Sequence, residues 1–325
     1  MTSFQRIALT AFICLEVLIF VGAAVRASGS GLGCPDWPFC YGCLVPPTSA
    51  EAIDFTKLDL EKFRHKAAQH GRDPSTITVE SLRAEFDPVA TWIEYLNRLT
   101  SLPVSLSVLG MLVYSFRQRV RVVRWTSLVA FVLLLANAWL GARVVLSGLK
   151  PGTITLHMGL AILMQCVLVF TIWRGSEIPW RFAASPRAVQ AAAWLFLLVV
   201  IEGIMGSQVR ELTDELARTH AGEARSVWVG ELEQSLVYLV HRSFSWMIVI
   251  TAGFFYFWAA RPTWLERVIL GLVLAQMSLG ILLARVGILA IAQILHIGLS
   301  SLLVSALCLW WLGSRRFVHP TLSAP

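Results

Sequence analysis

Eight long apolar runs constrain this chain more than any other feature of its sequence. The hydrocarbon core of a bilayer is about 30 Å thick, so a helix needs about 20 mostly apolar residues to cross it. Runs of that length lie at 7–26, 93–116, 125–147, 152–173, 188–207, 235–259, 264–284 and 288–313. With 56% hydrophobic and only 14% charged residues, the chain has too little polar surface for a soluble fold. We therefore expect an all-α membrane protein with eight transmembrane helices.

Basic residues between these runs predict how the helices are oriented. Arginines gather in alternate loops, at Arg6, Arg117, Arg119, Arg121, Arg124, Arg174, Arg181, Arg187, Arg261, Arg267, Arg315 and Arg316. The short loops on the opposite side hold little basic charge beyond Lys150 and Arg285. Because cytoplasmic loops are enriched in Lys and Arg, both termini are predicted to be cytoplasmic. The formal charge of +7 is then a matter of topology, and no nucleic-acid partner is expected.

The same rule places two long loops, 27–92 and 208–234, outside the cytoplasm. Both loops carry mixed charge, and their patterns predict short amphipathic helices at 55–70 and 210–218.

A faint internal repeat relates the first four spans to the last four. The matched positions are Gly22 with Gly206, Asn97-Arg98 with His241-Arg242, Leu140-Gly141 with Leu279-Gly280, and His157 with His296. Since each half has four spans, both halves keep the same orientation. The repeat predicts two pseudo-symmetric four-helix bundles, one of residues 1–175 including the outer loop and one of residues 176–325. Four-helix bundles commonly hold cofactors between facing helices.

Three histidines, His157, His241 and His296, fall within the first residues of their spans on the outer side. Ionisable residues within spans are rare and usually functional. A hydrogen-bonded core histidine is the plainer interpretation of any one of them, but three at matching depth favour a ligand. Imidazole binds haem iron, zinc, copper and nickel. A facing pair without a carboxylate or thiolate cluster best suits a six-coordinate haem.

Small and basic residues beside the histidines fit the same interpretation. Gly159 and Gly298 would let a flat macrocycle approach the helices. Arg98 and Arg242 directly follow ligand positions, and Arg is a natural bidentate partner for carboxylates such as the two haem propionates. Each arginine has an equally good alternative explanation as an interface residue that extends its charge into water.

Cysteines occur close together in the loop that follows the first span, at Cys34 and Cys40. The outer compartment is oxidising, so two nearby cysteines can form a disulfide there. Such a disulfide could be structural or redox-active. The redox-active alternative arises because a short, proline-constrained loop can make the bond reducible. Cys43 is left over as a free thiol, an alternative partner or a lipid-modified residue.

The end of the first span resembles the haem A synthase family of bacterial and mitochondrial proteins, in the stretch VRASGSGLGCPDWP at residues 25–38. The eight spans, the repeat and the outer histidines are also similar, over nearly the whole chain except 48–90. That family oxidises the C8 methyl of haem O to a formyl group by successive hydroxylations, and its product serves haem-copper terminal oxidases. The resemblance thus implies an oxidoreductase in the plasma (inner) membrane of a bacterium.

The resemblance also implies partners and site residues. Haem O would be the substrate, with haem O synthase and haem-copper oxidase assembly factors as partners, and a homo-oligomer is left open. A haem b cofactor would lie between His241 and His296 in the C-terminal bundle, beside Arg242. Cys34 and Cys40 would form the disulfide.

The N-terminal bundle would receive haem O, and here the sequence departs from the family. The family has Glu-x-x-His-Arg at the start of the second span, whereas this chain has Glu94-Tyr95-Leu96-Asn97-Arg98. Asn is a poor iron ligand, so His157 would be the single axial side chain. The open position either favours oxygen or water at the substrate iron, which we expect, or marks a site that has lost the reaction.

Glu94 is the expected catalytic residue of this site. It lies one helical turn before Asn97, so both face the same site. Its carboxylate would relay protons or stabilise positive charge during methyl oxidation, and its plainer role is a salt bridge to Arg98.

Two other functions compete with the enzyme. A haem b cytochrome that only carries electrons would usually need ligands at both depths of the bilayer, whereas all three histidines lie on one side. A haem transporter or chaperone would usually bind near the midplane between broken helices, which the sequence does not indicate.

Overall fold

The computed structural model describes residues 1–31, 33–34, 36–69, 73–147, 149, 152–176, 178–220, 223–259, 262–287 and 289–314. Within these ranges the chain forms helices, turns and loops but no strand. Eight described helices are long and apolar enough to cross a membrane: α1 (Ser3–Ala27), α4 (Pro88–Ser115), α5 (Arg121–Leu146), α6 (Thr153–Arg174), α7 (Pro186–Thr219), α9 (Leu236–Trp258), α10 (Trp264–Arg285) and α11 (Ala290–Ser314). The predicted all-α fold with eight spans is confirmed.

Most helices begin where polar capping residues precede an apolar run. Thr2 forms a capping box at the start of α1, and Asp87 accepts hydrogen bonds from two backbone N–H groups at the start of α4. Asp87 and Ser185 are each followed by a proline, whose fixed φ suits the first helical position.

The fifth spanning helix is longer than predicted. Instead of ending at residue 207, α7 continues through the expected amphipathic segment 210–218 to Thr219. No proline interrupts this stretch, and Arg210 forms an (i, i+4) ion pair with Asp214 at 2.8 Å. The polar segment therefore extends the spanning helix rather than starting a new one.

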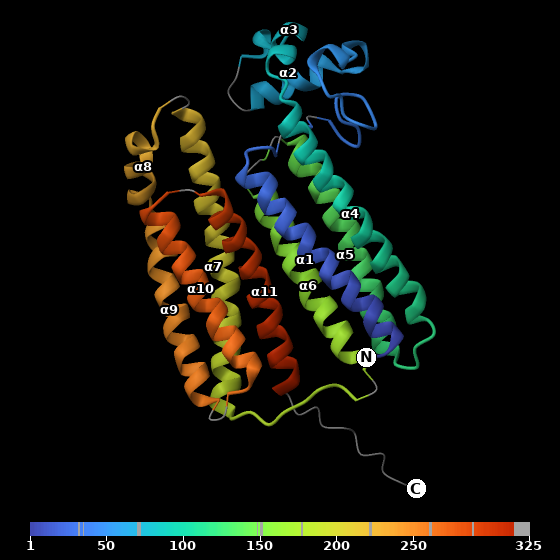
Figure 1. Ribbon diagram of the computed structural model, residues 1–325, viewed down its shortest axis with the longest axis vertical. Helices are drawn as coiled ribbons and strands as arrows, with labels where there is room; N and C mark the ends of the chain where they lie inside the picture. The colour runs from blue at the N-terminus through green and yellow to red at the C-terminus, as the bar shows by residue number, and fades with distance from the viewer. Residues whose placement is uncertain are drawn as a thin grey trace.

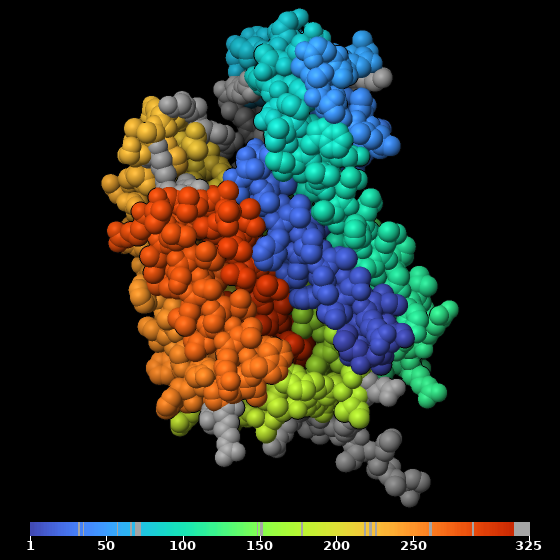
Figure 2. Space-filling model, in the orientation of Figure 1, coloured from blue at the N-terminus to red at the C-terminus, as the bar shows by residue number. Residues whose placement is uncertain are grey.

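The spanning helices form two groups that lie side by side (Figure 1). In one group α1 packs on α4 and α6, and α5 packs on α4 and α6. In the other, α9 and α11 each pack on α7 and α10. Each group has its own apolar core, around Leu168 in the first and Trp310 in the second. Between the groups, α11 contacts both α1 and α6, and Figure 2 shows α1 lying along the second group.

Side chains of α1 make the closest connections between the two groups. The buried carboxylate of Glu16 accepts hydrogen bonds from Gln165 on α6 and from Ser301 and Ser305 on α11. Near the other end of α1, Arg26 pairs with Asp214 on α7 at 3.2 Å. The first helix thus belongs to one core and is bonded to the other group.

Residues between α1 and α4 fold into a small unit at the end of the molecule away from the N-terminus, called here the loop end (Figure 1). Its α-helices are α2 (Leu60–Gln69), which lies within the segment 55–70 where a short amphipathic helix was expected, and α3 (Val79–Ala84), which was not expected. Ile77 and Leu82 are buried in its apolar core. Across the loop end, α8 (Arg225–Gln234) packs on α7 and α9.

Four basic residues of the orientation argument, Lys150, Arg261, Arg315 and Arg316, lie outside the described residues.

Candidate functional site

All three spanning-helix histidines lie near the loop end. His157 is four residues from the start of α6, His241 five from the start of α9 and His296 six from the start of α11. A rise of 1.5 Å per residue places them about 6–9 Å along their helices. The similar depth expected from the sequence follows from where these helices begin.

Each of the four matched positions faces a glycine on a neighbouring helix. A Cβ built on Gly141 would lie 3.4 Å from Cε1 of His157, and one built on Gly280 would lie 3.8 Å from Cε1 of His296. On the other helix pair, a Cβ on Gly206 would lie 3.4 Å from Cε1 of His241. Gly22 stands in the same relation to Asn97, with its Cβ position 3.9 Å from Oδ1. Because glycine has no Cβ, these four positions place no side chain against the neighbouring ring or amide.

The glycines that border the histidines are not those that the sequence suggested. Gly298 faces α1, where an added Cβ would lie only 2.2 Å from the ring of Phe20. Gly159 has no atom within 4 Å of its Cβ position. Gly298 is therefore needed for close packing of α11 on α1, because a larger residue would displace the phenyl ring.

Polar atoms at these positions lack hydrogen-bond partners. Nδ1 of His157 and His296 and Oδ1 of Asn97 are buried, and no described residue forms a hydrogen bond with them. Buried polar atoms are normally paired, so these atoms have hydrogen-bonding capacity that the described residues do not use. Three imidazoles next to glycines would suit a flat iron macrocycle, and no cluster of three or more His, Cys, Asp or Glu able to hold a bare metal ion occurs among the described residues.

A carboxylate lies beside one histidine and was not anticipated from the sequence. Glu202 on α7 places Oε1 3.2 Å from Nδ1 of His241. The same oxygen accepts a hydrogen bond from Ser245, one turn after His241 on α9. Glu202 precedes Gly206 by four residues, so both lie on the face of α7 that meets α9.

The cysteine loop is closed and packed against the start of α4. Cys34 and Cys40 form a disulfide with their Cα atoms 4.8 Å apart, and the backbones of Cys40 and Cys43 pair through two hydrogen bonds. Cys43 keeps a free thiol. A Cβ on Gly33 would lie 2.4 Å from the carbonyl oxygen of Ala90, so only glycine permits this approach to the helix.

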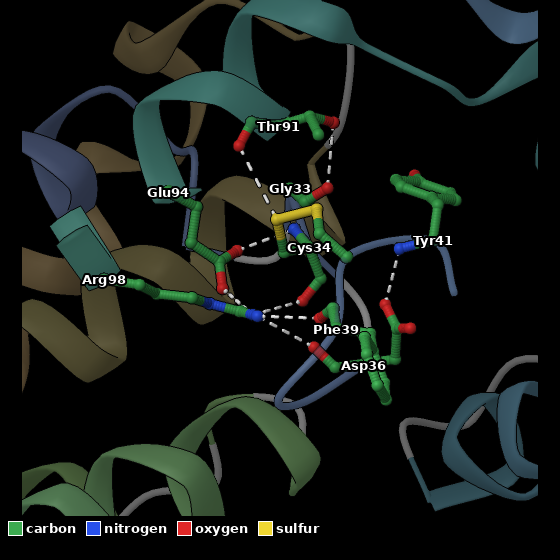
Figure 3. Close-up of polar contacts among 9 residues, drawn as sticks. Gly33, Cys34, Asp36, Phe39, Tyr41, Thr91, Glu94 and Arg98 are labelled. Carbon is green, nitrogen blue, oxygen red and sulfur yellow. Dashed lines mark hydrogen bonds and ion pairs between the residues drawn. A yellow bond between two sulfur atoms is a disulfide. The ribbon is translucent and has the colours of Figure 1, made fainter. Parts of the chain in front are cut away.

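Glu94 and Arg98 hold that loop in place (Figure 3). Glu94 accepts a hydrogen bond from the backbone N–H of Cys34 at 2.8 Å and forms an ion pair with Arg98 at 2.7 Å. Arg98 also donates to the backbone carbonyls of Cys34, Asp36 and Phe39 at 2.9–3.0 Å. The predicted salt bridge between Glu94 and Arg98 is therefore present, within a wider set of bonds that fixes the loop.

Arg242, at the matched position in the second half, has different surroundings. Its side chain is exposed, and its guanidinium lies over the ring of Tyr238, 5.9 Å from the ring centre. Tyr238 occupies the position that matches Glu94. The two arginines thus differ: Arg98 is bonded to the cysteine loop, whereas Arg242 has donors available to an external anion.

Comparison with known proteins gives a family match and several relatives. The family model described as "Cytochrome oxidase assembly protein" (COX15-CtaA) matches residues 5–308. A "Heme A synthase" of Listeria welshimeri is 26% identical over 173 residues, which cover 53% of this chain and 45% of the relative. A "Heme A synthase" of Bartonella tribocorum is 24% identical over 225 residues, covering 66% and 58%. The chain spans about half the length of the curated relatives it matches.

Proposed function

We propose that this chain, which belongs to the cytochrome oxidase assembly protein family, is a haem A synthase. The enzyme would be an oxidoreductase that converts the C8 methyl of haem O to a formyl group. The product would serve haem-copper oxidases. The observation that carries the proposal is the placement of three histidines and an asparagine at four matched positions of the spanning helices, each with a glycine of a neighbouring helix beside its side chain. The relatives named "Heme A synthase" support the same reaction.

We assign the haem b cofactor to the half formed by residues 176–325. His241 and His296 would ligate its iron, and Arg242, with its exposed guanidinium, would pair with a propionate. When bound, haem b supplies one-electron transfer. The histidines contribute two neutral donors, and Gly206 and Gly280 leave room beside them.

The substrate would bind in the half formed by residues 1–175, which we take to be related to the other half by pseudo-symmetry. His157 would hold the substrate iron from one side, while Asn97 leaves the other side open to a small molecule. Arg98, whose guanidinium is bonded to the cysteine loop, would act on the substrate through that loop. Because both Glu94 oxygens already accept bonds, the carboxylate is fixed in position for proton relay or for stabilising positive charge near the methyl carbon.

The proposal includes a location and partners. The protein would be a multi-pass protein of a bacterial inner membrane, with both termini in the cytoplasm and the loop end outside. Haem O synthase would supply the substrate, and assembly factors of a haem-copper oxidase would receive the product. The disulfide of Cys34 and Cys40 agrees with an oxidising outer compartment.

The deciding experiment is co-expression with a haem O synthase, followed by extraction and identification of the haems. Haem A or its hydroxylated intermediate should appear with the unaltered chain and should be lost in His157→Ala. A folded, haem-loaded protein that yields neither product would overturn the proposal and favour an electron carrier. In the same preparations, His241→Ala or His296→Ala should abolish the low-spin haem b spectrum, whereas Asn97→Ala should leave it intact.

A further inference from the structure

The carboxylate of Glu202 lies beside a predicted haem ligand, and the proposed function does not use it. Its Oε1 lies 3.2 Å from Nδ1 of His241, and its side chain is only 15% exposed. The distance between the two atoms suits a hydrogen bond, but the N–H of the ring does not point at the oxygen. A rotation of the imidazole would form the hydrogen bond.

We propose that Glu202 is a positioning residue for His241, an inference that rests on the proposed function. Its carboxylate would accept a hydrogen bond from the Nδ1–H of His241, so that Nε2 is the atom that faces the haem iron. A neutral imidazole has one N–H and one free nitrogen, and the hydrogen bond made by one nitrogen decides which of them binds metal. Histidines that bind metals almost always donate the other N–H to a carboxylate, carbonyl or water.

Ser245 holds Glu202 in this arrangement. Its hydroxyl donates to the same Oε1 that faces His241, and it lies four residues after His241 on α9. His241 and Ser245, which holds Glu202 in place, therefore lie on the same helix. The second oxygen of Glu202 forms no hydrogen bond with any described residue, so the carboxylate retains capacity to accept from the imidazole.

The matched position in the first half lacks this carboxylate. Gly206 matches Gly22, so Glu202 matches Leu18, and His241 matches Asn97. The first half thus lacks both the histidine and its carboxylate partner, whereas the second half has both. This difference makes the second half the one built to hold a haem tightly.

A carboxylate partner makes the imidazole a more basic ligand, which favours ferric over ferrous iron. Weakening the partner should therefore raise the midpoint potential of the haem bound by His241 and loosen its attachment. Losses of outer partners of metal-binding histidines typically cost about 10–100-fold in affinity.

The test is a potentiometric titration of the purified, haem-loaded protein, read from its low-spin spectrum, for Glu202→Leu, Glu202→Gln and Ser245→Ala. We expect the largest positive shift, and about 10–100-fold faster haem loss, in Glu202→Leu, with smaller shifts in the other two. Glu211→Gln is the matched control, because Glu211 lies on the same helix but faces Thr155 of α6. Its potential should equal that of the unaltered protein.

Unchanged potentials in Glu202→Gln and Ser245→Ala, with haem bound, would overturn the inference even if Glu202→Leu fails to fold. That result leaves the proposed function intact as long as His241→Ala still abolishes the spectrum. Absence of any haem in the unaltered protein would instead contradict the proposed function.

Discussion

Asn97 is the residue at which the two halves of the molecule differ most in chemistry. It occupies the position of His241, borders Gly22 as His241 borders Gly206, and has an unpaired Oδ1. Asn97 thus has a glycine neighbour like that of His241 but offers an amide where His241 offers an imidazole.

Replacing that amide with an imidazole tests whether the difference controls iron coordination. In Asn97→His, haem bound at His157 should gain a second axial nitrogen and change from a high-spin to a low-spin spectrum. Electron paramagnetic resonance of protein loaded with haem O would show the change, with Asn97→Ala as the control that stays high-spin. An unchanged spin state would mean that Asn97 does not face the iron.

Glycines beside the histidines supply a second prediction at this scale. In Gly206→Val the side chain would start 3.4 Å from Cε1 of His241 and extend into the space that the ring edge needs. The haem b absorbance should fall at least several-fold in purified protein. Gly253→Val is the matched control, since nothing lies within 4 Å of its Cβ position on α9. Equal haem content in both variants would contradict the assigned role of Gly206.

The sequence was sufficient to find the histidines but not Glu202. A histidine inside an apolar run stands out because it is rare there, and the repeat relates Asn97 to His241 and His157 to His296. Glu202 also lies in an apolar run, but its significance depends on contact with a different helix. Only the packing of α7 on α9 brings the carboxylate to His241.

Among the elements, the boundaries of α7 and the path of the cysteine loop were the least predictable. Hydropathy falls after residue 207, but hydropathy reports the membrane boundary and not the end of a helix. The loop is positioned by Arg98 and by the close approach of Gly33 to α4, neither of which has a periodic pattern. The spans themselves were predictable because length and apolar composition decide them.

Tyr41 in the cysteine loop should make the stability of this element sensitive to alkaline pH. Burial, with a further contribution from the carboxylate of Asp36, raises the pKa of Tyr41 to about 12. The unfolded phenol has a pKa of about 10, so the folded state holds its proton more tightly. The resulting stability is present below pH 10 and is lost as the pH rises from about 10 to 12.

The measurement is the unfolding temperature of the unaltered protein and of Tyr41→Phe between pH 8 and 11.5. Phenylalanine keeps the edge-on contact of the ring with Phe86 and has no proton to lose. The unfolding temperature of Tyr41→Phe should therefore rise relative to that of the unaltered protein only above about pH 10. A constant difference over the whole range would contradict the prediction.

For the whole molecule, the bonds of Glu16 are expected to hold the two groups of helices together. Glu16→Ala would leave the donors of Gln165 and Ser301 without their acceptor in a buried position. Each unsatisfied buried group costs about 1–3 kcal/mol. The variant should unfold at a lower temperature in detergent, while Glu16→Gln, which keeps an acceptor oxygen, should lose less.

Thr10→Ala is the control for this experiment. Thr10 lies on α1 as well, but its hydroxyl is exposed and bonds only to the carbonyl of Arg6 in the same helix. If Thr10→Ala and Glu16→Ala unfold at the same temperature, the contact between the groups does not depend on Glu16.

The position of Glu16 in the first spanning helix has a consequence for the order in which the protein is made. Its partner Gln165 follows it by 149 residues and its partner Ser301 by 285. At a synthesis rate of about 5–20 residues per second, the carboxylate waits about 15–60 s for the last helix. Until Gln165 and then Ser301 have been made, the carboxylate of Glu16 lacks these partners, so α1 needs another polar group beside it in the membrane during synthesis.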